Sequence, residues 1–118
     1  MIEKLGIGID VVDIKQFEKI PYSSKPKFYK KIFLESEIKY CLKYKNSSEH
    51  FGGKFAIKEA VIKSIPEQIS LLDIETFHLN SKPKVKLRGN IGRKYVFLVS
   101  VSHQKKYAIG VVVSERIG

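Results

Sequence analysis

The stretch GIGIDVVDI, Gly6 to Ile14, is the feature that most constrains how this chain can fold. Because side chains of a strand alternate between two faces, one face carries only large apolar residues and the other carries two glycines followed by Asp10 and Val12. A glycine inside a strand is best explained by close approach of a ligand or of another backbone. A buried carboxylate persists when it is paired, hydrogen-bonded or metal-bound. The stretch therefore predicts a strand whose Asp10 either holds a cation or caps the following helix.

The length of 118 residues fits one domain spanning residues 1–118. Its apolar runs are too short to span a membrane, and its N-terminus lacks the apolar region of a signal peptide. The single cysteine, Cys41, excludes an internal disulfide and a multi-cysteine metal site, and we expect it to fill the core from a helix. We expect a cytoplasmic protein without membrane contact.

The chain is strongly basic, with a net charge of +10 at pH 7, which indicates an acidic partner. Lysine supplies 19 of the 22 basic residues. Proteins that read bases and phosphates rely more on the planar fork of arginine, so nucleic acid is the less favoured partner. Residues 14–45 hold nine lysines against three glutamates, which places the excess charge in the first third of the chain.

Apolar spacing along the chain predicts helices followed by strands. Helical spacing covers residues 14–20, 28–44 and 49–65, and residues 21–28 between the first two predict a turn-rich loop. Strand-like runs follow at residues 71–79, 84–89, 95–102 and 107–114. In the second run Val85 and Leu87 are expected to face inward, with basic residues facing out. This order favours an α+β fold, an antiparallel β-sheet packed with helices.

The predicted helix GGKFAIKEAVIKS, residues 52–64, has no wide polar face when laid out at about 100° per residue. Glu59 is therefore expected in a largely buried environment. It could form a simple helix pair with Lys63, four residues on. Alternatively, Glu59 and Asp10 converge on one hard cation such as Mg²⁺, whose other ligands would be phosphate oxygens and water. Lys63 would then reach the same phosphates.

The segment SVSH, Ser100 to His103, does not predict a serine hydrolase. Ser102 and His103 are adjacent on a strand and point to opposite faces, and no G-x-S-x-G turn is present. The GIGIDVVD stretch likewise lacks the third glycine and the helix start of a dinucleotide fingerprint.

Four segments in the same order, GIGIDVVDI, FGGKFAIKEAVIKS, SKP and SVSHQKKYAIGVVV, resemble the holo-acyl-carrier-protein synthases, the single-domain phosphopantetheinyl transferases, over almost the whole chain. The resemblance implies transfer of 4′-phosphopantetheine from coenzyme A to a serine of apo acyl carrier protein, with release of 3′,5′-ADP. It also implies a homotrimer that binds the coenzyme between subunits, and a basic first helix that faces the acidic carrier.

The resemblance assigns roles to individual residues. Asp10 and Glu59 match the magnesium ligands, and Lys63 matches a lysine that binds the coenzyme's phosphates, so these three are the implied catalytic residues. Glu59, or a water that it orients, is the candidate general base. The positions around the coenzyme, besides Lys63, match Lys54, Lys58, Lys82, Pro83, Ser102 and His103. The candidate carrier-docking residues are Lys15, Lys27 and Lys31.

Three departures from the family pattern concern the rim of the pocket. Ser81 stands where the family has glycine before Lys-Pro, Leu34 replaces a threonine, and the long helix ends without the usual glycine-containing turn. None removes a metal ligand. The alternative function is a non-catalytic basic module, a degenerate relative that binds RNA or an acidic protein, and the retained Asp10, Glu59 and Lys63 argue against it.

Overall fold

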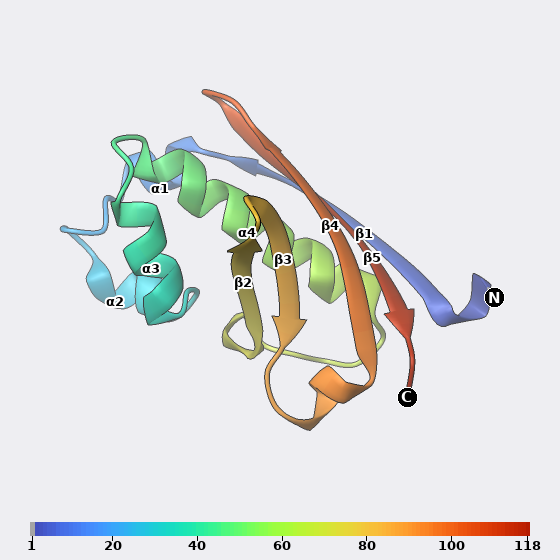
Figure 1. The fold of residues 1–118 in the computed structure, drawn as a ribbon. Coiled ribbons are helices and arrows are strands. Elements are labelled where there is room, and N and C mark those ends of the chain that lie inside the picture. Colours follow the sequence, from blue (N-terminus) through green and yellow to red (C-terminus); the bar gives the residue numbers. More distant parts are fainter. Residues whose placement is uncertain (1) are drawn as a thin grey trace.

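The computed structural model describes residues 2–118, in which one long helix lies against two small antiparallel sheets (Figure 1). The helices are α1 (Lys15–Glu18), α2 (Pro26–Lys30), α3 (Glu35–Leu42) and α4 (Ser47–Ser64). The strands are β1 (Leu5–Asp13), β2 (Ile74–Leu79), β3 (Lys82–Leu87), β4 (Tyr95–His103) and β5 (Tyr107–Arg116). Short 3₁₀ turns cover Ile2–Lys4, Leu71–Asp73 and Asn90–Arg93.

The strands form a three-stranded sheet in the order β1-β5-β4 and a separate β2-β3 hairpin, all antiparallel. Helix α4 packs on the inner face of β1 and β5 and also contacts β4 and β2, while β3 runs beside β4 (Figure 1). Val85 and Leu87 are buried, and Lys84 and Lys86 between and beside them are exposed, as the alternation predicted. The α+β prediction is confirmed.

Glycines allow α4 to approach the sheet at backbone distance. A Cβ atom on Gly8 would overlap the carbonyl oxygen of Ala60, and one on Gly6 would overlap that of Ser64. On the neighbouring strand, a Cβ on Gly110 would lie 2.7 Å from the carbonyl carbon of Ala56. Of the two explanations for glycine in the first strand, close approach of another backbone is therefore the one that the structure supports.

Two buried clusters divide the core along α4. The first packs α1, α2 and α3 around the start of α4 and is rich in aromatic rings, including Phe17, Tyr29 and Phe51. Cys41 of α3 is fully buried in it, as expected. The second cluster joins the later turns of α4 to β2, β3, β4 and β5.

Three details differ from the sequence-based expectation. The helix expected over residues 28–44 is interrupted, because residues 31–34 lie outside both α2 and α3. The segment expected to be a loop contains helix α2, which begins at Pro26. Proline suits the first position of a helix, but five residues are too few to show a helical period. Residues 71–73 form a 3₁₀ turn where a strand was expected, so β2 begins only at Ile74. None of the helices within residues 2–118 combines the length and the apolar character needed to cross a bilayer.

We expect Gly8→Ala to lower the free energy of unfolding by about 1–3 kcal/mol, because the new methyl group must displace the backbone of α4. Gly53→Ala is the matched control. Its Cβ would meet Val101 at 3.4 Å, an ordinary contact, and alanine is favoured over glycine within a helix by about 0.5–1 kcal/mol. Urea unfolding should therefore move the two midpoints in opposite directions. Equal stability of Gly8→Ala and the parent chain would contradict the close packing.

Candidate active site

Two carboxylates and a lysine meet where α4 runs alongside β1. Asp10 lies in the middle of β1, opposite Gly110 of β5, and therefore does not cap a helix. Asp13, just before α1, accepts a hydrogen bond of 2.9 Å from the Lys15 amide. Lys63 of α4 reaches across to β1, where its ammonium donates to Asp10 Oδ1 and to the Ile9 carbonyl, both at 3.0 Å. Lys63 therefore bonds across to β1 and does not form a simple helix pair with Glu59.

Glu59 shares this site, and its surroundings disfavour its ionised form. Burial raises the pKa of the Glu59 carboxyl, the nearby Asp10 carboxylate raises it further, and Lys63 offsets part of the shift. Two carboxylates that repel each other at a half-buried position fit a hard dication, because it would neutralise both. Asp10 and Glu59 are thus suited to hold Mg²⁺, with phosphate oxygens and water as the remaining ligands.

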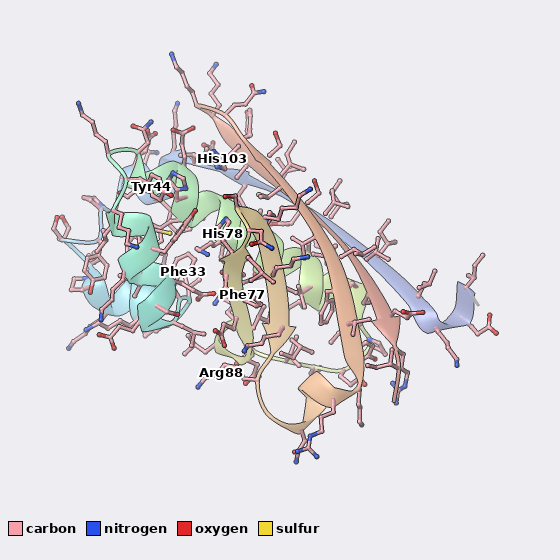
Figure 2. All side chains as sticks on the ribbon, viewed as in Figure 1. Phe33, Tyr44, Phe77, His78, Arg88 and His103 are labelled. Atoms are coloured by element: carbon pink, nitrogen blue, oxygen red, sulfur yellow. The ribbon has the colours of Figure 1, made fainter. Side chains whose placement is uncertain are left out.

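A second group of polar side chains lines a pocket on the other side of α4. Three of the pocket residues are His50, His78 and His103, which are all the histidines of the chain. Figure 2 shows His78 and His103, with Tyr44 nearby, around the first turns of α4. The His50 ring stacks on Tyr44 at 3.8 Å between centroids and lies 5.1 Å from the His103 ring. Lys54, Pro83 and Lys84 also line the pocket.

The pocket gathers basic side chains whose protonated forms are disfavoured by burial. Burial lowers the pKa of Lys54, and it also lowers the pKa values of His50 and His78, which Lys54 lowers further. A bound anion would favour the protonated forms of all three groups. Glu49 moderates this positive character at one point, since its carboxylate lies 3.8 Å from Nδ1 of His103.

The assignment of Lys58 to the coenzyme contacts is corrected by the structure. Its side chain is 0% exposed, and Nζ lies 2.7 Å from Oε1 of Glu37, itself fully buried. The same ammonium donates to the carbonyls of Ile32 at 2.9 Å and Leu71 at 3.0 Å. These three partners use its three hydrogens. Lys58 therefore joins α3, α4 and the segment before β2, and it does not face a ligand.

Two other sequence-predicted residues, Lys82 and Ser102, do not line this pocket. Lys82 is exposed at the start of β3, directly after the turn at Asn80 and Ser81. Ser81 has φ +65°, the left-handed conformation that favours glycine, so the residue type at this departure from the family pattern works against the turn. Ser102 is exposed on the outer face of β4, opposite to His103, as strand alternation predicted. It lies in another groove, together with Glu49 and Tyr107.

Sequence reasoning missed His50, His78 and Tyr40 as pocket residues. Tyr40 stacks on His78 with 4.6 Å between ring centroids and lies under the Lys54 ammonium, which is 4.7 Å from its centroid. These residues come from α3, α4 and β2 and share no spacing along the chain.

Comparison with known proteins places these features in a family. Residues 6–112 match the model of the 4′-phosphopantetheinyl transferase superfamily. The holo-[acyl-carrier-protein] synthase of Thermodesulfovibrio yellowstonii is 39% identical over 96% of this chain and 98% of its own length. That of Geobacter sulfurreducens is 33% identical over 94% and 97% of the two chains.

Solved structures agree with the sequence comparison. A holo-(acyl-carrier-protein) synthase from Bacillus anthracis, in complex with CoA (3′,5′-ADP), has a TM-score of 0.78 and 31% identity over 95% of this chain and 96% of its own. The Helicobacter pylori synthase in complex with coenzyme A has a TM-score of 0.77 and 33% identity over 92% and 99% of the two chains. The chain therefore belongs to the holo-[acyl-carrier-protein] synthase family of 4′-phosphopantetheinyl transferases.

Proposed function

We propose that residues 1–118 form one transferase domain that moves 4′-phosphopantetheine from coenzyme A to a serine of apo acyl carrier protein in the cytoplasm, with Mg²⁺ as cofactor and 3′,5′-ADP as product. The observation that carries the proposal is the meeting of Asp10, Glu59 and Lys63 between β1 and α4. The coenzyme complexes of the related synthases support the choice of donor.

The nucleophile in this reaction belongs to the carrier, so the enzyme's task is to align a hydroxyl and to stabilise charge on a pyrophosphate. The serine oxygen bonds to the β-phosphorus as the bond to the departing 3′,5′-ADP breaks. Magnesium bound by Asp10 and Glu59 would supply charge stabilisation. Lys63 is within reach of the same place and can exchange Asp10 for phosphate oxygens. Glu59, or a water that it orients, is the candidate to take the serine proton.

The direct test is the mass of an apo acyl carrier protein after incubation with this protein, coenzyme A and Mg²⁺. We expect a gain of one phosphopantetheine, and none when the carrier serine is replaced by alanine. An unchanged carrier mass, together with tight, salt-dependent binding of RNA, would instead support a basic binding module.

The metal assignment predicts opposite effects on activity and on stability. Glu59→Gln should abolish transfer and yet raise the melting temperature at neutral pH without Mg²⁺, because the folded state disfavours the ionised carboxylate. The sign follows from the raised pKa: the parent chain loses stability relative to the variant as pH rises from the ordinary Glu pKa of about 4.5 through the raised value. Adding Mg²⁺ and coenzyme A should raise the melting temperature of the parent chain and of the exposed control Glu3→Gln by more than that of Glu59→Gln, which keeps the cationic pocket but lacks one metal ligand. Near-normal transfer by Glu59→Gln at saturating Mg²⁺ would refute the assignment.

We place carrier docking on the basic surface of α1 and α2. Lys15 begins α1, Lys27 lies within α2 and Lys31 follows it, and all three side chains are exposed above the aromatic cluster. Their charge complements an acidic carrier, and such complementarity chiefly speeds encounter and fixes orientation.

We further propose a homotrimer. The outer face of the β1-β5-β4 sheet carries a row of uncovered apolar side chains, in which Ile7 is 70% and Leu98 72% exposed on either side of Val113. A contiguous apolar face of this kind is typical of an interface. Glu59 and Lys54 also lie about 140° apart around α4, so the carboxylates and the cationic pocket face different sides of one chain. A neighbouring chain can bring its pocket to the carboxylates.

The shared site predicts complementation between inactive chains. Glu59→Gln and His103→Ala, unfolded and refolded together, should regain part of the activity in mixed trimers, because one intact site can form from two different chains. Glu59→Gln with Asp10→Asn is the control and should regain none, since both residues belong to the same half of the site. Light scattering should give about three times the 13.5 kDa chain mass. A fully active monomer would overturn the shared site.

A further inference from the structure

Thr76 of β2 contacts two charged side chains, although the proposed reaction gives Thr76 no role of its own. The residue is 4% exposed. Its hydroxyl lies 2.6 Å from Oε2 of Glu37 on α3 and 3.0 Å from Nζ of Lys54 on α4. Thr76 therefore stands between a buried carboxylate and the ammonium that lines the cationic pocket.

The direction of these hydrogen bonds is set by the groups involved. The Glu37 carboxylate can only accept, and it does so from the Leu34 amide, the Thr76 amide and Lys58, each at 2.7 Å. The hydroxyl hydrogen of Thr76 must therefore point to Glu37, which leaves its oxygen lone pairs for Lys54, a group that can only donate. The ion pair with Lys58 holds the Glu37 carboxylate in place, and the carboxylate in turn orients the Thr76 hydroxyl.

The consequence is a lysine whose ammonium is held in place before a ligand arrives. Lys54 is 5% exposed, and its ammonium lies over the Tyr40 ring beside the pocket. A lysine side chain has several rotatable bonds, so fixing it in advance removes an ordering cost from binding. The hydroxyl also supplies an acceptor to a charge that is otherwise poorly solvated.

We propose that Thr76 is a positioning residue for coenzyme binding: its hydroxyl, oriented by Glu37, holds the Lys54 ammonium against the pocket so that it meets an anionic group of coenzyme A. This inference rests on the proposed function, because Lys54 is taken to face the coenzyme.

Thr76→Val removes the hydroxyl at nearly constant volume. We expect it to raise the KM for coenzyme A roughly tenfold, the range for one hydrogen bond to a charged group, and to leave kcat and the KM for the carrier nearly unchanged. Thr76→Ser keeps the hydroxyl and should restore the KM. If Thr76 acts through Lys54, adding Thr76→Val to Lys54→Met should cause no further increase.

Two outcomes would overturn the proposal: an unchanged KM for coenzyme A in Thr76→Val, or the same increase in the Lys54→Met background as in the parent. Should the valine variant fail to fold, Thr76→Cys, with a weaker donor and acceptor, must still show a raised KM. Calorimetric titration with coenzyme A separates this inference from the proposed function. A Thr76-dependent affinity in a chain that transfers nothing would leave Thr76 in place and refute the transfer.

Discussion

The backbone contact between α4 and the sheet is the constraint on which the rest of the molecule depends. Gly6, Gly8 and Gly110 remove the side chains that would keep the helix away. Because Asp10 lies on the same face of β1 as two of these glycines, the contact that seats the helix also brings the carboxylate to Glu59 and Lys63. A sheet that held α4 at the usual side-chain distance would leave Asp10 without these partners.

Because α4 packs so closely against the sheet, its lysines need specific hydrogen-bond or ion-pair partners. Lys58 pairs with Glu37, Lys54 bonds to Thr76, and Lys63 reaches Asp10. Within residues 2–118, no buried side-chain nitrogen or oxygen lacks a partner. Burial disfavours the charged forms of Lys54, Lys58 and Glu59 alike, and for Glu59 the nearby Asp10 carboxylate adds to this effect. Two neighbouring carboxylates, one of them with a raised pKa, are typical of a functional site, and this supports the cation proposed there.

The sequence allowed prediction of what depends on short-range periodicity. Strand alternation placed Asp10 with the glycines and separated Ser102 from His103. The resemblance named candidate site residues on the long helix, of which Lys58 faces the core. The sequence did not predict the partner of Lys58, because Glu37 lies 21 positions away on another helix and spacing along the chain carries no information about that contact. His50 and His78 were missed as pocket residues for the same reason, since they lie on other elements than His103, which the resemblance had named. Helix α2 was too short to show a period.

The same packing bears on assembly. Helix α4 covers only the inner face of the β1-β5-β4 sheet, which leaves the row containing Ile7, Val113 and Leu98 without a cover from its own chain. The helix also separates the carboxylates at β1 from the pocket beside β4, because its width stands between them. Packing of the outer face against a neighbouring chain would bury the apolar row. The same contact could bring the pocket of one chain to the carboxylates of the next. One association would thus stabilise the chain and complete its site, which links the stability of the fold to its activity.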